Sequence, residues 1–563
     1  MTSIFEQIKL LYDQQLYSNL VVVADLVLSA SNHSNDLLSP LAKFQTLVYY
    51  GESLFHNDRY RKAENIFREA LQLRKSFMKN KETAKLLEQQ KDLFSDIEIK
   101  YQIHLCHVNL RQNDQAINTL QSIPGKQRNP KINMALAKLY QQGGMERSAI
   151  TAYKEVLREC PLALEAAEGL LSVGVKGVEV NSLMIEAVSG LDWLIKWIKG
   201  HAHLHGREYQ LAIATFQDLR LRSPLRDNHS ILVSLGEAYH HSGEGAHALS
   251  TLQNAFLSDP TMIRGLDALA SQLYQNKKFS ELEKIVPPLW YQQEHNKPEI
   301  FTTLGYLLYA NNNPNRACYL VHKACLLCPK NIEALILKGA LLYEIKKFQD
   351  AAIHFKEAIQ VAPYRHEPHK GLIDCYIAMH RIREAVTIAS NACKQLGQTP
   401  RALVLYATVL MKDPVTVCKA KNLLEKALAQ NETCLPAVYL LAEIYEQEMN
   451  LEAAISLLER QVSLTPNCRL HQMLGDLLSR MHEDEKAFNH YQSALNLDPN
   501  NRRALEGMNR LDQLSTSGMG GAGKLDSSYY NMSDAEQADT SYDVNHDHLA
   551  EFSDHEASSE VSL

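Results

Sequence analysis

Glycine, alanine and one large apolar residue recur along this chain in a fixed order, and each set is followed by a proline. The set before Pro363 consists of a glycine, an alanine, a phenylalanine and a second alanine. A similar set precedes Pro329, which gives a period of about 34 residues. The recurring positions, those near the N-terminus included, are Gly339, Ala351, Phe355 and Ala358; Gly475, Ala487, Tyr491 and Ala494; Gly305 and Ala317; Gly236 and Ala248; and Gly51 and Ala63.

This period predicts two antiparallel helices in each unit, joined by a short polar turn such as residues 344–347. The small residues let the two helices approach closely, the large residue fills the space to the next unit, and the proline ends the second helix. The pattern is that of tetratricopeptide repeats, which stack into a solenoid. We therefore expect an all-α solenoid of about 13–14 helix pairs, stabilised by contacts between neighbouring repeats. The expected pairs lie at 1–36, 41–77, 97–130, 131–163, 164–190 (with a degenerate second helix), 193–226, 229–262, 263–297, 298–331, 332–365, 366–399, 400–434, 435–467 and 468–501.

Three regions follow from the repeat map. Residues 1–170 are predicted to be N-terminal repeats that mediate dimerisation, with a charged, mobile insertion at 78–96. Residues 171–510 are predicted to be C-terminal repeats that form a superhelical groove. Residues 511–563 lack aliphatic periodicity and are rich in Ser, Gly and Asp, which predicts a disordered acidic tail.

Charge and composition exclude several classes of protein. The net charge is −7, but residues from Leu514 onward carry one Lys and ten acidic residues, so the rest of the chain is close to neutral. A near-neutral body with an acidic tail is a poor nucleic-acid binder, because phosphate binding needs a concentrated basic face. The sequence shows no signal peptide and no apolar stretch near the ~20 residues of a membrane helix. The ten cysteines follow no disulfide spacing, so we expect reduced thiols inside a cell.

Motifs that carry chemistry are weak in this sequence. Residues 518–524 (GMGGAGK) resemble a phosphate-binding loop, but no strand is expected before them and Leu525 stands where Mg²⁺ binding needs Ser or Thr. The histidines 201, 203 and 205 include an i, i+4 pair, yet no further ligand lies near them in sequence, so no metal site is predicted. Cys325 and Cys328 form a lone pair inside a helix and are expected to be buried thiols. The chain is predicted to be no enzyme and to need no cofactor.

Solenoids of this class bind partners, and the concave surface is lined mainly by the first helix of each pair. Its expected lining is aromatic and acidic, and Lys370 is the one basic residue found at the positions considered. Such a lining lacks the basic clamp that binds a terminal carboxylate, and it suits a basic or helical partner segment. An alternative is that the tyrosines pack within the superhelix. The predicted groove residues are Tyr274, Tyr306, Tyr309, Tyr343, Tyr439, Glu443 and Glu446.

Several non-consensus segments resemble the anaphase-promoting complex (cyclosome) subunit 7 family, over about residues 1–510. They are LVYYGESLFHNDRYRKA (47–63), PKINMALAKLY (130–140), AYKEVLRECPLALEA (152–166), LDWLIKWIK (191–199), SPLRDN (223–228), DPVTVCKAKNLLEKAL (413–428) and LHQMLGDLL (470–478). The resemblance implies a non-catalytic, homodimeric scaffold subunit of a ubiquitin ligase that acts in the cell cycle. It implies contacts with related repeat subunits, help in presenting coactivator and substrate, and a location in nucleus and cytoplasm. A chaperone co-factor and a repeat subunit of a transport or ciliary complex are the alternatives.

The N-terminal helix pair is predicted to form the dimer interface. The second helix of the pair is apolar almost all round, which contact with the next repeat alone does not bury. An uncapped apolar end of a solenoid requires a partner, and a second copy related by a two-fold axis is the simplest one. A monomeric cap is the alternative. The predicted interface residues are Ile4, Ile8, Leu11, Val23 and Val27.

Seven positions carry the pattern of phosphorylation sites. Four precede a proline, as proline-directed kinases require, and three have an acidic residue three positions on. Phosphates in the tail would deepen its negative charge. The seven are Ser39, Ser223, Thr399 and Thr465, and Ser533, Thr540 and Ser553.

Overall fold

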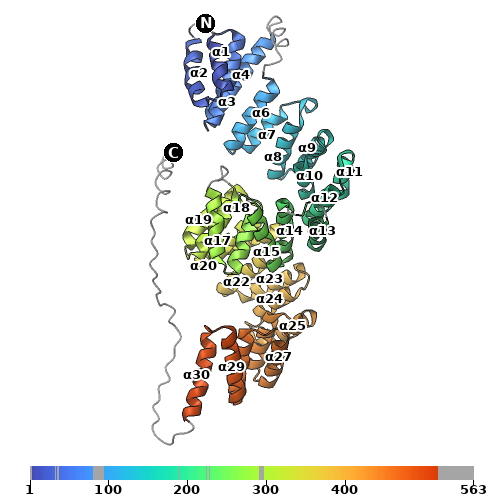
Figure 1. The fold of residues 1–563 in the computed structure, drawn as a ribbon, viewed down its shortest axis with the longest axis vertical. Coiled ribbons are helices and arrows are strands. Elements are labelled where there is room, and N and C mark those ends of the chain that lie inside the picture. Colours follow the sequence, from blue (N-terminus) through green and yellow to red (C-terminus); the bar gives the residue numbers. More distant parts are fainter. Residues whose placement is uncertain are drawn as a thin grey trace. The chain divides into compact units, whose positions relative to one another are not determined.

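A computed structural model of the 563-residue chain shows the fold. It describes residues 3–31, 33, 37–79, 94–188, 190–222, 225–226, 228–290 and 297–517. Contacts divide the chain into a first unit, residues 1–427, and a second unit, residues 428–563, and the division lies inside one helix. Every regular element among the described residues is a helix, and successive helices follow one another side by side within each unit (Figure 1). None of these helices is long and apolar enough to cross a bilayer.

The described helices form fourteen pairs and one final helix, which confirms the predicted tetratricopeptide-like array. Two short 3₁₀ segments, Gly125–Gln127 and Pro414–Thr416, interrupt the connections. The pairs are α1 (Ile4–Asp13) and α2 (Tyr17–Ser31); α3 (Pro40–His56) and α4 (Tyr60–Lys79); α6 (Asp96–Asn109) and α7 (Asn113–Gln121); α8 (Pro130–Gln142) and α9 (Glu146–Glu159); α10 (Leu164–Ser172) and α11 (Gly177–Val188); α12 (Asp192–His205) and α13 (Tyr209–Arg222); α14 (His229–Ser242) and α15 (Gly245–Ser258); α16 (Leu266–Gln275) and α17 (Phe279–Trp290); α18 (Pro298–Ala310) and α19 (Pro314–Leu327); α20 (Ile332–Glu344) and α21 (Phe348–Val361); α22 (His366–Ala378) and α23 (Ile382–Gln395); α24 (Pro400–Leu410) and α25 (Val417–Gln430); α26 (Leu435–Gln447) and α27 (Leu451–Leu464); α28 (Cys468–Arg480) and α29 (Asp484–Leu497); then α30 (Arg502–Ser517).

The turn inside a pair is built on one left-handed residue. After α20, Lys346 has φ 65°, and the N–H of Lys347 donates to the carbonyl of Leu342 at 2.9 Å. This bond satisfies a carbonyl that the end of the helix leaves without an intrahelical partner. Equivalent residues with positive φ stand after α6, α18 and α28, at Arg111, Asn312 and His482. The recurring turn explains why many pairs share one geometry.

The glycines of the repeat lie where an aromatic ring of the second helix meets the first. A Cβ atom on Gly339 would lie 2.7 Å from Cε1 of Phe355, and one on Gly371 of the next pair would lie 2.3 Å from Cζ of the same ring. The ring of Phe355 therefore fills the space between two successive first helices. In the second unit, Tyr491 occupies the same place between Gly475 and Gly507.

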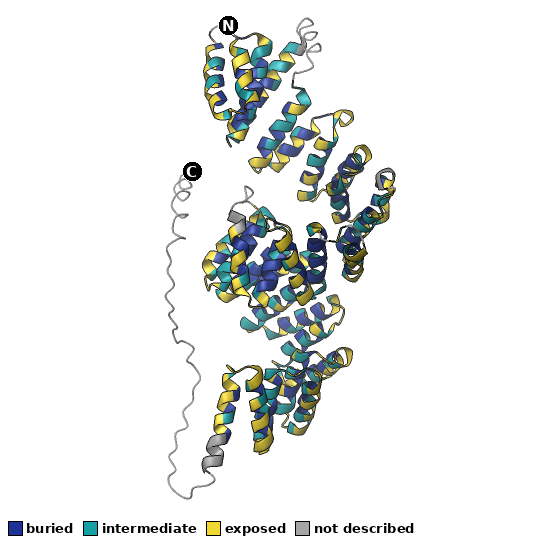
Figure 2. Cartoon of the chain, viewed as in Figure 1, coloured by how far each residue is buried: buried dark blue, intermediate teal, exposed yellow. Residues whose placement is uncertain are grey.

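The other repeat positions are also placed at helix contacts. A Cβ atom added to Gly51, Gly236 or Gly305 would lie only 2.4–2.6 Å from a side chain of the second helix of its pair. The alanines of the repeat are fully buried, so no larger side chain fits there without moving a helix. Buried residues lie on the helix sides that face neighbouring helices, and exposed residues lie opposite them (Figure 2). The buried alanines are Ala63, Ala248, Ala317, Ala351, Ala358, Ala487 and Ala494.

The structure corrects three boundaries. Leu511 is buried against the last repeat, so helix α30 continues into the predicted tail as far as Ser517, and the tail beyond it lies outside the described residues. The ends of the predicted insertion 78–96 belong to α4 and α6, while residues 80–93 lie outside the described part. The second helix of 164–190 is regular rather than degenerate, because Val180 and Met184 are buried in a core shared with α9 and α12.

That same core runs from Ala116 to Ile198. No boundary between cores therefore lies at residue 170. The predicted limit at 170 marks only how far the dimer surface is expected to extend.

Candidate partner-binding groove

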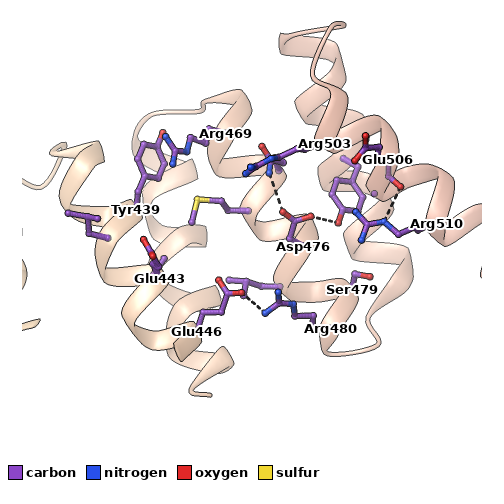
Figure 3. A pocket seen from close by; sticks show the side chains of 17 residues that line it. Tyr439, Glu443, Glu446, Arg469, Asp476, Ser479, Arg480, Arg503, Glu506 and Arg510 are labelled. Carbon is purple, nitrogen blue, oxygen red and sulfur yellow. Dashed lines mark hydrogen bonds and ion pairs between the residues drawn. The ribbon is translucent and has the colours of Figure 1, made fainter. Parts of the chain in front are cut away.

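An open groove of about 550 Å³ lies in the second unit, between α26, α28, α29 and α30 (Figure 3). Three predicted groove residues line it from α26, namely Tyr439, Glu443 and Glu446. They share one face of the helix because they are spaced by four and three residues. Whether a partner occupies this groove stays a prediction.

Local sequence fixes the helices that carry the groove. Pro436 stands in the first turn of α26, where its missing N–H leaves no helical bond unmade. The side chain of Asn467 accepts a hydrogen bond from the N–H of Arg469 at 3.0 Å at the start of α28. The side chain of Asn501 accepts one from the N–H of Ala504 at 3.1 Å and so caps α30.

The walls of the groove are joined by polar contacts between repeats. The guanidinium of Arg469 lies 4.4 Å from the ring centroid of Tyr439, a cation–π contact, and Arg480 pairs with Glu446. The hydroxyl of Tyr491 donates to Asp476 at 2.7 Å, and burial raises the pKa of this phenol well above its usual range. These contacts hold the wall in one conformation before a partner binds.

Basic residues are scarce at the predicted lining positions, where Lys370 is the one found, but they are frequent in this groove. Arg469, Arg480, Arg503 and Arg510 all line it, and Arg503 makes no ion pair with any residue that the structure describes. The prediction considered only one row of positions, on the first helix of each pair. These arginines stand instead at the second and last residues of α28 and on α30, a helix outside the predicted pairs.

The predicted tyrosines of the first unit occupy a different environment. Tyr274 stacks on Tyr309 with ring centroids 4.8 Å apart, and its ring lies 5.7 Å from that of Tyr306, which is buried. Tyr343 packs against Phe348 of its own pair at 5.3 Å. These contacts agree with the alternative that the rings pack within the superhelix.

Buried ion pairs cross the interior of the first unit. Glu333 of α20 forms an ion pair with Arg365 at 2.9 Å and lies 2.9 Å from Nε2 of His240 in α14. Burial alone would raise the pKa of Glu333, but the charge of Arg365 and the contact with His240 hold it well below its usual range. Nearby, burial and the charges of Glu333 and Glu299 raise the pKa of Asp267 to about 7. Glu333, His240 and Asp267 also line an open pocket of about 200 Å³.

The N-terminal helices expose an apolar face that differs from the predicted one. Ile8 is 0% exposed within its own chain, so it is excluded from a dimer interface. Leu11, Val23 and Val27 are half-buried against the first core, and Ile4 is exposed. The most exposed apolar residues of α2 are Val22 at 59% and Leu26 at 65%.

Of the seven candidate phosphorylation sites, three lie in the described part. Ser39 and Thr399 are exposed and precede the first residues of α3 and α24, where a phosphate is favoured by the helix dipole. Thr465 is half-buried and accepts a hydrogen bond from Gln461 at 3.1 Å. Ser223, Ser533, Thr540 and Ser553 lie outside the described residues.

Comparison with known proteins supports the fold and shows the family. A family model described as "Anaphase-promoting complex, cyclosome, subunit 3" matches residues 282–358, and one described as "Tetratricopeptide repeat" matches residues 419–477. The human protein named "Anaphase-promoting complex subunit 7" is 40% identical over 508 residues, which is 88% of this chain and 90% of the human protein. The chain belongs to the anaphase-promoting complex subunit 7 family.

More distant relatives keep the same name and a similar length. The subunit 7 protein of Arabidopsis thaliana is 26% identical over 530 residues, which cover 90% of this chain and 94% of the relative. The crystal structure of the APC/C hetero-tetramer Cut9-Hcn1 is similar with a TM-score of 0.54 at 15% identity, over 90% of this chain and 95% of that chain. At this identity the likeness shows the fold alone. The chain is thus an anaphase-promoting complex tetratricopeptide-repeat subunit, and its relatives are named as subunits of a complex.

Proposed function

We propose that this chain is a non-catalytic scaffold that organises neighbouring subunits of the anaphase-promoting complex and helps to present coactivator and substrate in the cell cycle. The open groove of the second unit is the observation that carries this proposal. It is polar, it is stiffened by contacts between repeats, and it presents four arginines and four carboxylates to a partner. Such a surface suits a partner segment that carries charges of both signs.

The groove offers free charges of both signs on opposite walls. Arg503 has no carboxylate partner among the described residues, and Arg510 donates from Nε to the backbone carbonyl of Glu506 at 3.3 Å. Glu443 on the opposite wall also makes no ion pair within the described part. We infer that a coactivator tail or a small helical subunit binds here with its acidic group toward α30.

Co-purification tests this role. The variant Arg503→Glu should lose one partner of the assembled complex while the other subunits still co-purify, because the mutation reverses a charge in the groove without touching a core residue. Lys486→Glu is the matched control, since it makes the same charge change on α29 outside the lining. Retention of every partner by Arg503→Glu would contradict the role of the groove.

A homodimer through the N-terminal repeats is the second part of the proposal. The exposed Val22 and Leu26 lie one turn apart on α2, so they form one apolar stripe that this chain leaves largely uncovered within its described part. A stripe of this kind at the first repeat needs either a cap or a partner. We further propose that the protein acts in the nucleus and cytoplasm, in keeping with a cell-cycle role of the family.

A further inference from the structure

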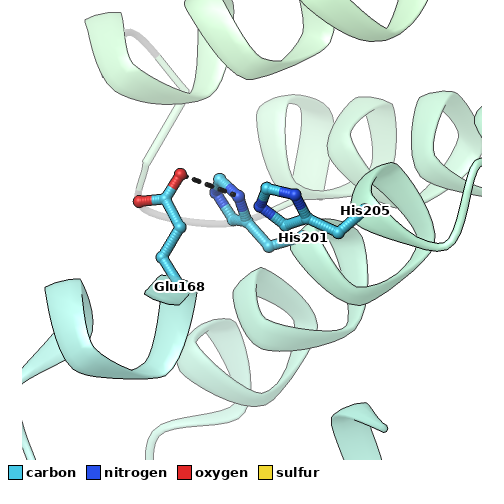
Figure 4. Close-up of side chains that lie close together, drawn as sticks. All are labelled: Glu168, His201 and His205. Atoms are coloured by element: carbon cyan, nitrogen blue, oxygen red, sulfur yellow. Dashed lines mark ion pairs between the residues drawn. The ribbon is translucent and has the colours of Figure 1, made fainter. Parts of the chain in front are cut away.

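A cluster of metal-ligating side chains lies in the first unit, at the junction of α10 and α12 (Figure 4). Glu168 projects from α10, and His201 and His205 project from α12, one helical turn apart. One ligand atom from each residue lies within 4.8 Å of the other two. The sequence alone offered no third ligand beside the two histidines, because Glu168 belongs to the preceding repeat.

Two ring nitrogens of these histidines make no hydrogen bond with any described residue. Nδ1 of His201 and Nε2 of His205 are buried and make no hydrogen bond in the described structure. The His201 side chain is only 1% exposed. A buried ring nitrogen without a partner is costly and calls for an explanation such as a bound ion.

The chemical form of the cluster suits a metal. Two imidazoles and one carboxylate converge here, and one ligand atom of each lies within 4.8 Å of the others. Neutral imidazole is the form that ligates metals. Two imidazoles and one carboxylate are a donor set that zinc uses, with water as a fourth ligand.

A second ring of contacts orients the carboxylate. Arg264 forms an ion pair with Oε1 of Glu168 at 3.1 Å and donates a hydrogen bond to Glu237 at 2.8 Å. Carboxylate ligands of metals are commonly held by such outer contacts. The positive charge of Arg264 is outweighed by the two carboxylates, which leaves one net negative charge beside the two imidazoles.

The spacing of the ligand atoms also fits an ion. The distance from Nδ1 of His201 to Oε1 of Glu168 is 3.7 Å. Zinc ligands at about 2.0–2.2 Å from the ion lie about 3.3–3.5 Å from one another. Closing the cluster onto an ion therefore needs side-chain shifts of about 1 Å and no helix movement. His205 also lines an open hollow of about 540 Å³.

We propose that Glu168, His201 and His205 form a zinc site that fastens two consecutive repeats of the first unit. The ion would join α10, one of the shortest described helices, to α12. Through Arg264 the site would extend to α14, which carries Glu237. Its role is structural, because Glu168 and Glu237 are both paired with Arg264 and so neither carboxylate is free to act as a base.

Zinc binding by the purified full-length chain tests the proposal. After removal of metals by a chelator, competition between the protein and a chromogenic zinc indicator gives the number and affinity of sites. The wild type should bind one more Zn²⁺ per chain than His205→Ala or Glu168→Gln, or bind it at least tenfold more tightly. His203→Ala is the matched control, because His203 faces Glu208 at 2.6 Å instead of the cluster.

Two further readouts separate this site from thiols and from misfolding. Substitution by Co²⁺ should give the visible bands of a tetrahedral site without the thiolate charge-transfer band that any of the ten cysteines would produce. Zn²⁺ should raise the melting temperature of the wild type and of His203→Ala, but not that of Glu168→Gln. Equal zinc binding by wild type, His205→Ala and Glu168→Gln, or thiolate bands in all of them, would overturn the proposal.

Discussion

Replacing Gly339 by alanine probes the closest packing of the repeat. The new Cβ atom would lie 2.7–2.9 Å from three atoms of the Phe355 ring, whereas carbon atoms in contact lie about 3.5–4.0 Å apart. The Phe355 ring cannot move away from Gly339, because Gly371 of the next repeat also packs closely against it. The substitution must therefore move a helix or force the ring out of its rotamer.

The expected magnitude combines two opposing effects. Overpacking of this kind costs about 1–3 kcal/mol. A glycine-to-alanine change in a helix raises the free energy of unfolding by about 1 kcal/mol, because alanine loses less backbone entropy on folding. We expect Gly339→Ala to lower the free energy of unfolding by about 0–2 kcal/mol. In a Phe355→Leu background the ring is gone, so the same change should become neutral or stabilising by up to about 1 kcal/mol.

A double-mutant cycle measured by hydrogen exchange of α20 and α21 decides between these outcomes. Exchange reports the local opening of these helices, which suits an array whose repeats need not unfold together. Gly125→Ala is the control, because no atom lies within 4 Å of its new Cβ, and it should change stability by less than about 0.5 kcal/mol. If Gly339→Ala costs the same free energy in the Phe355→Leu background as in the wild type, the ring is not the obstacle and the reasoning fails.

Two other predictions concern the N-terminal face and the buried carboxylate. Val22→Glu combined with Leu26→Glu should give monomers in light scattering, because charges would enter a desolvated interface, while Leu257→Glu on an exposed surface should leave the wild-type mass unchanged. A wild type that is already monomeric at micromolar concentration would refute the dimer. Burial raises the pKa of Asp267 to about 7, above its value of about 4 in the unfolded chain. Protonation of Asp267 therefore stabilises the fold fully below about pH 4, and this stabilisation is lost as the pH rises through about 7. In urea unfolding, the stability of the wild type should therefore fall from pH 5 to 8, and that of Asp267→Asn should change less. Loss of the bond to Asn331 would shift the variant's stability by the same amount at every pH. Parallel pH profiles of wild type and variant would contradict the raised pKa of Asp267.

The sequence predicted the repeat well because its signal is local and steric. Gly475 and Tyr491 have the same separation along the chain as Gly339 and Phe355, and each pair meets across one turn of fixed geometry. Any register error would have placed an aromatic ring against a larger residue. The number of pairs follows from this spacing, and the structure confirms it. The final helix α30 has no second helix within the described residues, and the repeat map did not predict it.

The sequence could not show which of the neighbouring apolar residues of α2 are exposed. Valines 21, 22 and 23 are chemically alike, and only the placement of α3 decides that Val21 is buried and Val22 is exposed. The zinc ligands were missed for a related reason. Glu168 and His201 lie on successive repeats, so their approach depends on how the repeats stack, although the spacing of His201 and His205 already signalled a pair on one helix face.

Contacts between distant repeats also hold the first unit together. The guanidinium of Arg207 donates to the carbonyl of Val361 at 3.5 Å, and Tyr209 packs against Tyr364 with ring centroids 5.3 Å apart. Similarly, Arg401 donates to the carbonyl of Gly243 at 3.4 Å. The stability of the first unit therefore depends on these contacts between distant repeats as well as on contacts between neighbouring repeats. The sequence had predicted only the contacts between neighbouring repeats. The surfaces proposed here for partners are the exposed N-terminal stripe of Val22 and Leu26 and, in the second unit, the groove, where Arg503 makes no ion pair within the described residues.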